Sequence, residues 1–188
     1  ALLLSKKVGK SNQQLTLLLD IARSHRQKGD YSRAFSYLDH MHKENSTNIA
    51  RFSVEADLEA AKIYWYQGNY RLAKDFQQKA LTNAVKNSNS FLQIQALSLG
   101  GLIALNQGEL TNAEQLIESA LSLSRNTHRV SEEAVQLNNL GIVYRQKGDL
   151  INAENSFAKA LSIDKKLGSP EGKAYDLRNL GINFYLRG

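Results

Sequence analysis

The sequence contains no cysteine, only one proline and no long apolar run. The absence of cysteine excludes a disulfide framework, a thiol nucleophile and a cysteine-ligated zinc or iron–sulfur site. Because Pro170 is the single proline, few helices are forced to break, and long helices are permitted throughout. The apolar run at residues 1–4 is far below the roughly 18 residues that a membrane span needs. These absences predict no transmembrane helix, and they do not assign the chain to a compartment.

The net charge of +6 comes from 24 basic and 18 acidic residues, and it is unevenly spread. Residues 1–50 are basic, whereas residues 101–150 are mildly acidic. Charge of this kind is typical of solvated helix faces. Nucleic-acid binding through the basic part is the alternative, but no dense cluster of lysine and arginine with interleaved aromatic residues appears.

Similar segments recur along the chain, each centred on a glycine. These glycines are separated by 39, 40, 40 and 40 residues, and they are Gly29, Gly68, Gly108, Gly148 and Gly188. An alanine stands five residues after each of the first four, and these alanines are Ala34, Ala73, Ala113 and Ala153. A fixed period of this kind indicates a repeat architecture.

Each glycine is expected to take the left-handed conformation that ends one helix, and the next residue caps a second helix. Among these caps Asp30, Asn69 and Asp149 are good, whereas Glu109 is weak. Small residues at inward positions of both helices, such as Gly141, allow a tight antiparallel pair. The apolar periodicity predicts first helices over about 12–28, 49–67, 90–107, 131–147 and 170–187, and second helices over about 31–43, 70–86, 110–125 and 150–167.

One repeat carries a recognisable signature. The pattern Leu140-Gly141-x-x-Tyr144, followed by Ala153, Phe157 and Ala160, resembles the tetratricopeptide repeat at its usual offsets. The resemblance covers essentially the whole chain, with a period longer than the usual 34 or so residues, as in kinesin light chains and many bacterial regulators. It implies an all-α fold, a right-handed α-solenoid of antiparallel helix pairs. The implied repeats are residues 11–48, 49–89, 90–129 and 130–169, with the first helix of a fifth at 170–188.

The two ends resemble interrupted repeats. Residues 1–9 align with residues 160–168, including a lysine pair and a glycine, so residues 1–10 are expected to end a preceding repeat. Gly188 matches the turn glycine of a fifth repeat without its second helix. Because solenoids normally close with polar capping repeats, we expect a piece of a longer array whose ends associate with other copies.

No catalytic, metal or cofactor motif is evident in the sequence. The glycines are spaced as helix stops and never as a phosphate-binding loop. His40 and His42 point about 200° apart on a helix, so they do not chelate one ion. Glu132 and Glu133 fall at a helix start, where the helix dipole favours negative charge. We therefore expect no enzyme activity, no bound metal and no cofactor.

The concave face of stacked repeats is the default binding surface, and the resemblance implies that first helices line it. The groove residues it implies are Arg23, Arg26, Lys62, Trp65, Tyr66, Leu99, Leu102, Leu105, Asn138, Asn139, Arg145, Arg178, Asn179 and Tyr185. The three leucines have an alternative place in the core. Asn138 and Asn139 resemble the paired asparagines that hold peptide main chain in kinesin-light-chain-like arrays, since an amide both donates and accepts. Arg145 and Arg178 would favour an acidic residue in the ligand.

Three functions remain open at this point. The first is a scaffold that binds a peptide or protein segment in the groove. The second is a ligand-sensing region that controls an attached effector domain. The third is a helical-repeat nucleic-acid binder that uses the arginines and Lys62, whose binding would weaken steeply as salt rises.

Overall fold

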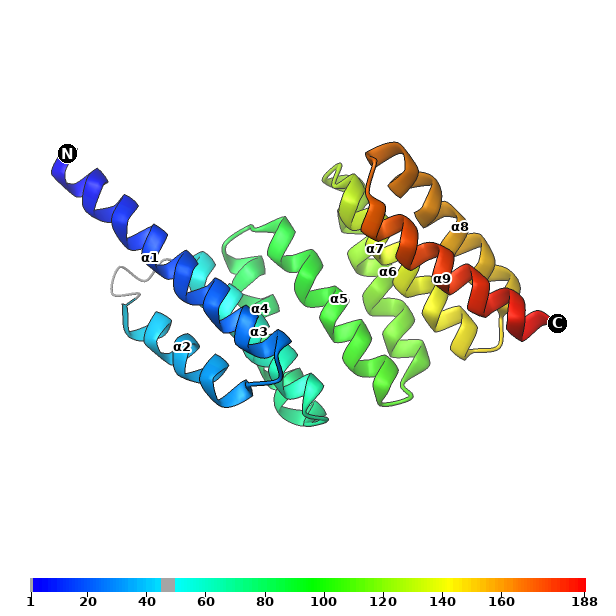
Figure 1. Ribbon diagram of the computed structural model, residues 1–188, viewed down its shortest axis with the longest axis horizontal. Coiled ribbons are helices and arrows are strands. Elements are labelled where there is room, and N and C mark those ends of the chain that lie inside the picture. Colours follow the sequence, from blue (N-terminus) through cyan, green and yellow to red (C-terminus); the bar gives the residue numbers. More distant parts are fainter. Residues whose placement is uncertain (1, 45–49) are drawn as a thin grey trace. The chain divides into compact units, whose positions relative to one another are not determined.

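The computed structural model describes the backbone of residues 2–44 and 50–188, and side chains from residue 12 onwards within these ranges. Every regular element in these ranges is an α-helix (Figure 1). The helices are α1 (Leu2–Gln27), α2 (Tyr31–Glu44), α3 (Ala50–Tyr66), α4 (Tyr70–Lys86), α5 (Ser90–Asn106), α6 (Leu110–Asn126), α7 (Val130–Gln146), α8 (Leu150–Leu167) and α9 (Pro170–Arg187). From α2 onwards, their ends agree with the predicted ends within a few residues. None of the described helices is long and apolar enough to cross a membrane.

The chain divides into two compact units, Ala1–Leu92 and Gln93–Gly188. In the first unit, α1 packs on α2 and α3 packs on α4, while α3 also contacts α1 and α2. In the second unit, α7 packs on α6 and α8, and α9 packs on α8 and α7. Each unit therefore contains helix hairpins whose first helices also touch one another. The continuity of all repeats in one array stays a prediction.

The turn glycines have the predicted conformation. Their φ values are positive, at 76° for Gly29, 74° for Gly68, 76° for Gly108, 81° for Gly148 and 90° for Gly188. The predicted caps also form, because Asn69 Oδ1 accepts from the Leu72 amide at 3.3 Å and Asp149 Oδ1 accepts from the Asn152 amide at 3.1 Å. Glu109 makes no capping hydrogen bond, as expected for the weakest of the four.

The core of each hairpin depends on small residues. The repeated alanines Ala34, Ala73, Ala113 and Ala153 are fully buried. Gly141 of α7 faces the buried ring of Phe157 of α8, and a Cβ at residue 141 would lie 2.5 Å from that ring. Gly101 faces Ile117 in the same way. The glycines let first and second helices approach closely enough to bury these large side chains.

Two features of the chain differ from the sequence-based expectation. The predicted start of the first helix near residue 12 is wrong, because α1 is continuous from Leu2 to Gln27 and includes Gly9. A glycine inside a helix costs only about 0.5–1 kcal/mol relative to alanine, so it does not end a helix by itself. The turns between repeats also use left-handed residues, with Ser88 at φ 51°, His128 at φ 53° and Gly168 at φ 67°. Only the glycine among these three was identifiable from its residue type.

Candidate functional site

The predicted basic residues of the first unit form an ion-pair network around one buried carboxylate. Glu59 of α3 is 1% exposed. Its Oε1 lies 2.7 Å from Lys62 Nζ and 3.5 Å from Arg23 Nε, and its Oε2 lies 2.8 Å from Arg26 Nε. Burial raises the pKa of Glu59, but the nearby charges and hydrogen bonds of Lys62 and Arg26 outweigh this effect. The pKa of Glu59 is therefore lowered from its ordinary value. Arg23 is also 4.0 Å from Glu55.

This network changes the interpretation of the predicted groove in the first unit. Arg23, Arg26 and Lys62 already have a carboxylate partner within the chain, so they do not present free charge to an acidic ligand. The two predicted aromatic residues remain accessible. Tyr66 is 56% exposed, and the centre of its ring lies 4.9 Å from that of half-buried Trp65. The Arg26 guanidinium lies 5.5 Å from the centre of the Tyr66 ring.

The predicted leucines of the second unit belong to the core. Leu99 is 4% exposed and Leu105 is 7% exposed. Leu105 packs in a buried cluster with Ile117 and Leu140, and Leu102 is partly buried against the same cluster. The sequence allowed these leucines either in the groove or in the core, and the structure places them in the core. Their assignment to an open groove is corrected, because Leu99 and Leu105 are buried and Leu102 packs partly buried against the core cluster.

The predicted asparagines are buried and hydrogen-bond to other side chains of the chain. Asn138 donates through Nδ2 to Asp176 Oδ1 and accepts through Oδ1 from Asn179 Nδ2 at 2.9 Å. Asn139 Nδ2 donates to Ser98 Oγ at 3.1 Å. Because Asn138 already uses both a donor and an acceptor, these amides tie first helices together. The sequence indicated that the amides pair with polar groups, but not that these groups lie in the same chain.

Two arginines of the second unit lie in a different environment from those of the first. Arg145 of α7 stacks 5.4 Å from the centre of the Phe157 ring and donates to the Asn179 carbonyl at 3.4 Å. Arg178 of α9 lies 4.6 Å from the centre of the Tyr175 ring. Burial lowers the pKa of Arg145, and the positive charge of Arg178 lowers it further. Among the described residues, neither arginine has an ion-pair partner within 4.0 Å.

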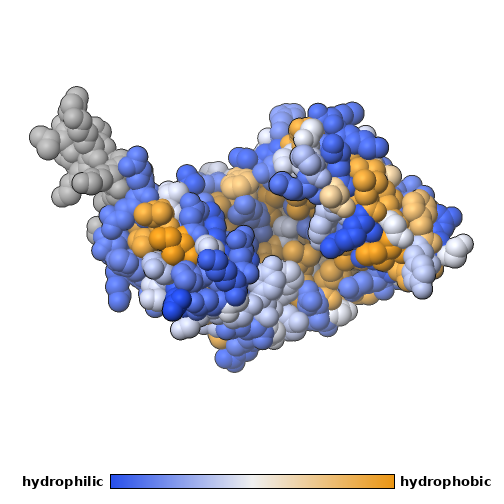
Figure 2. Space-filling view, viewed as in Figure 1, coloured by the Kyte–Doolittle hydropathy of each residue, from blue (hydrophilic) through white to orange (hydrophobic). Residues whose placement is uncertain are grey.

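Exposed apolar side chains lie on α9, the helix that carries Arg178. Tyr185 is 86% exposed, and Tyr175 and Ile182 are 46% and 41% exposed. Figure 2 shows apolar residues gathered over the end of the chain that α9 occupies in Figure 1. Aromatic residues and arginine dominate interface energies. Among the described residues, α9 thus presents the unpaired Arg178 beside exposed aromatic rings, and the unpaired Arg145 lies on α7.

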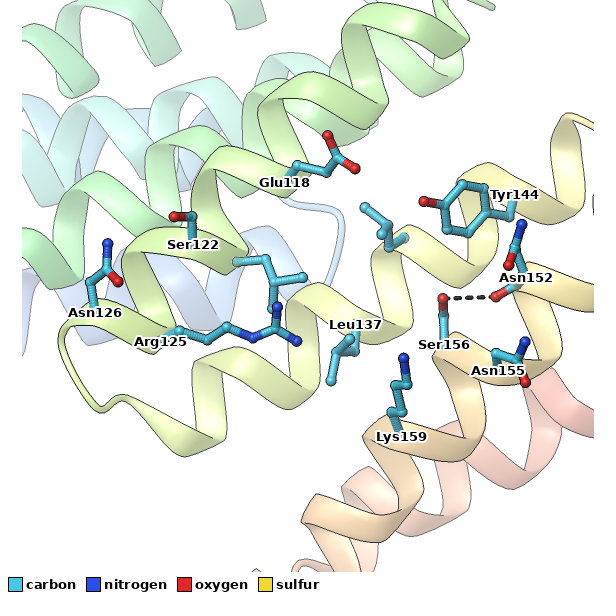
Figure 3. Close-up of a pocket in the computed structure, with 12 residues that line it drawn as sticks. Glu118, Ser122, Arg125, Asn126, Leu137, Tyr144, Asn152, Asn155, Ser156 and Lys159 are labelled. Carbon is cyan, nitrogen blue, oxygen red and sulfur yellow. Dashed lines mark hydrogen bonds between the residues drawn. The ribbon is translucent and has the colours of Figure 1, made fainter.

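A hollow that the sequence did not predict lies among α6, α7 and α8 (Figure 3). It has a volume of about 450 Å³ and is lined by Glu118, Leu121, Ser122, Arg125, Asn126, Leu137, Leu140, Tyr144, Asn152, Asn155, Ser156 and Lys159. Burial and the nearby carboxylate of Glu114 raise the pKa of Tyr144 above its ordinary value. Its walls come mostly from the second helices α6 and α8, and the three lining residues of the first helix α7 are not among the predicted groove residues, so this hollow is separate from the predicted groove.

The chain matches models of one repeat family and resembles several solved structures. Two tetratricopeptide-repeat models match residues 58–84 and 92–166, which together are more than half of the chain. No curated protein matches significantly in sequence. The apo form of RapI is 14% identical with a TM-score of 0.77, over 92% of this chain and 64% of that protein. The Rap conjugation gene regulator of the plasmid pLS20, solved in complex with the Phr* peptide, is 22% identical with a TM-score of 0.78, over 98% of this chain and 51% of that protein.

A third similar structure comes from the kinesin-light-chain group. It is a protein of Podosopora anserina, assigned as a kinesin light chain with nearly identical TPR-like repeats, and it is 16% identical with a TM-score of 0.69. The match covers 93% of this chain and 87% of that protein. At these identities the structural likeness shows the fold, an all-α repeat solenoid. With the glycine period, the helix hairpins and the two family models, it places the chain among the tetratricopeptide-repeat proteins.

Proposed function

We propose that this chain binds a peptide or protein segment on the first-helix face of its second unit and carries out no catalysis. The observation that carries the proposal is the contrast between the two sets of basic residues. Arg23, Arg26 and Lys62 surround Glu59, whereas Arg145 and Arg178 have no carboxylate partner in the part of the chain that the structure describes. Two guanidinium groups near each other repel, and an acidic ligand would relieve that repulsion.

The geometry of the two arginines supports a carboxylate ligand. The ring contacts and the Asn179 carbonyl hold the guanidinium groups in place before any ligand arrives. Arginine presents a planar fork of donors that matches a carboxylate. Tyr175, Ile182 and Tyr185 supply exposed apolar surface, and burying it contributes roughly 25 cal/mol per Å². The ligand we propose therefore has an acidic side chain or a free C-terminus beside apolar residues.

One of the structurally similar proteins favours a peptide ligand over other classes. The pLS20 Rap regulator was solved with a bound peptide, and this chain aligns over 51% of its length. A role in regulation, in which a bound peptide controls an attached domain, is the finer form of the same proposal. The nucleic-acid alternative has less support, because three of its five predicted phosphate contacts are ion-paired with Glu59.

A peptide array tests the proposed function. Random eight-residue peptides are displayed in matched sets, with acidic residues intact, with Asp and Glu replaced by Asn and Gln, and with free or amidated C-termini. We expect binding to require a carboxylate in the peptide. Arg145→Gln and Arg178→Gln should each weaken binding about thirtyfold or more, since removing one partner of a partly buried charge pair typically costs about 2 kcal/mol or more.

The matched control is Lys159→Gln, which removes an exposed cation of α8 at the hollow in Figure 3. This variant should bind the selected peptides as the parent does, with unchanged helicity. If Lys159→Gln abolishes binding while both arginine variants bind normally, the ligand occupies the second-helix side, and the proposal is wrong. Binding that ignores peptide carboxylates altogether would contradict the proposed role of the arginines.

Self-association through the end of the second unit also stays a prediction. On α9, Leu177 and Phe184 are 55% and 53% exposed, although the matching residues of α7 pack in buried clusters, Leu137 with Ala160 of α8 and Tyr144 with residues of α6. Sedimentation velocity over a hundredfold range of concentration should show reversible association. Leu177→Gln combined with Phe184→Gln should reduce it, because less apolar surface is then available. A parent chain that stays monomeric at every concentration would refute this prediction.

A further inference from the structure

Two buried carboxyl groups meet where α7, α8 and α9 come together. Asp176 of α9 is 2% exposed and Asp164 of α8 is 9% exposed. The Asp164 carboxyl lies against Gly172, which is one helical turn before Asp176 on the same face of α9, so the two carboxyl groups are neighbours and each acts on the other's charge. Asp176 Oδ1 accepts a hydrogen bond from Asn138 of α7, whereas its Oδ2 is buried without a partner. A buried carboxylate oxygen without a donor is costly, so this arrangement needs a physical explanation.

The backbone of α9 is shaped to accept the carboxyl group of Asp164. At Gly172 any Cβ would collide with the Asp164 carboxyl, so a larger residue there would drive the group away. Gly172 lies in the first turn of α9, and its amide donates to the capping hydroxyl of Ser169 at 3.1 Å. Negative charge on Asp164 is favoured beside this helix N-terminus. Asp176 lies further along α9, away from that favourable end.

The surroundings of Asp176 favour its neutral form. Burial raises the pKa of Asp176, the hydrogen bond from Asn138 opposes this, and Asp164 raises it again, to a value of about 6. From α8 the facing group is the Asp164 carboxyl, and from α7 it is the neutral amide of Asn138. Asn179, also on α9, donates to Asn138 rather than to either carboxyl. No basic side chain is among the groups that act on the Asp176 pKa.

We propose that Asp164 and Asp176 share one proton and form a pH-sensitive joint that fixes α9 against α7 and α8. With one proton between them, one carboxyl donates to the other, and the polar atoms of the joint gain the donor they lack. When that proton is lost, two buried negative charges face each other and repel. The joint therefore holds α9 more firmly under mildly acidic conditions than at neutral pH.

The direction of the effect follows from proton binding. Between the ordinary aspartate pKa of 3.8 and about 6, the folded chain holds a proton that the unfolded chain has released. Stability therefore falls as pH rises through this window and levels off above it. A difference of about two units corresponds to roughly a hundredfold change in the unfolding equilibrium constant. The joint also connects to the arginines, because Asn138 bonds Asn179, whose carbonyl accepts from Arg145.

The experiment compares the full 188-residue chain with its Asp176→Asn variant in thermal unfolding from pH 4.5 to 7.5. Asparagine is neutral at every pH, accepts from Asn138 and donates to Asp164. The variant and the parent should unfold at similar temperatures near pH 4.5. At pH 7.5 the variant should melt at least about 4 °C higher, which makes it a stabilising change. Glu171→Gln on the exposed surface of α9 is the control and should show no such pH-dependent offset.

A direct titration gives an independent readout that does not depend on how the variant folds. The side-chain carboxyl ¹³C signal of Asp176 in the parent chain should titrate with a midpoint near pH 6. In Asp164→Asn this midpoint should fall, because the second carboxyl is gone. A midpoint near 4 in the parent chain, or an Asp176→Asn offset that is the same at every pH, would overturn the proposal.

Discussion

Replacing Glu59 by alanine is expected to lower the free energy of unfolding by about 2–4 kcal/mol, because it leaves three half-buried cations without their common partner. Arg26, Lys62 and Arg23 all converge on this carboxylate, which is almost completely buried. The loss comes mainly from uncompensated positive charge, and less from the attraction itself. Chemical denaturation followed by circular dichroism measures the change.

The Glu59 network also predicts a pH dependence. The pKa of Glu59 is lowered in the folded chain, so its contribution to stability is present above the ordinary pKa of 4.5 and is lost as pH falls through the folded value. Asp75→Ala, at an exposed position of α4, is the control and should change stability by no more than about 0.5 kcal/mol. If Glu59→Ala unfolds at the same denaturant concentration as the parent, the ion-pair network does not stabilise the first unit.

Alanine substitutions at two equivalent glycines are expected to have opposite effects. Gly141→Ala should destabilise the chain by about 1–3 kcal/mol, because the new methyl group meets the fully buried ring of Phe157. Gly181→Ala occupies the corresponding position of α9, where a Cβ meets nothing within 4 Å. At that position, the better helix propensity of alanine should raise the free energy of unfolding by up to about 1 kcal/mol. Thermal unfolding of the two variants beside the parent measures both signs.

The paired design separates packing from backbone effects. Both substitutions make the same change inside a first helix, so propensity alone predicts two stabilised proteins. Only the close approach of α8 distinguishes the two sites. Two variants with equal stability would show that Phe157 moves aside freely and that the glycine at position 141 is not required by packing.

The repeat architecture was predictable because glycine and alanine carry a local physical meaning at fixed spacing. A glycine such as Gly148 can adopt positive φ without strain, and a small residue such as Ala153 allows helices to approach. These properties depend on residue type and on neighbours a few positions away. Helix ends and hairpin pairing therefore followed from the sequence. The predicted start of the first helix near residue 12 is wrong, because a glycine such as Gly9 costs a helix only about 0.5–1 kcal/mol and does not end it by itself.

The partners of the polar residues were not predictable, because they come from other helices. The sequence marks Arg26 and Arg178 as similar groove residues, but only three-dimensional packing places Glu59 beside the first and, among the described residues, no carboxylate beside the second. Asn138 likewise matches a peptide-binding pattern, although its amide contacts Asp176 and Asn179. His128 adopts a left-handed backbone conformation that its residue type does not predict.

The binding surface is tested most directly by NMR of side-chain groups while a carboxylate-containing peptide from the array is added. The Nε–Hε signals of Arg145 and Arg178 report on the first-helix face of the second unit. The side-chain amide signals of Asn152 and Asn155 report on the hollow of Figure 3. We expect the arginine signals to shift and saturate with peptide while the two asparagine signals stay unchanged. Saturating shifts of Asn152 and Asn155 with unmoved arginine signals would contradict the account.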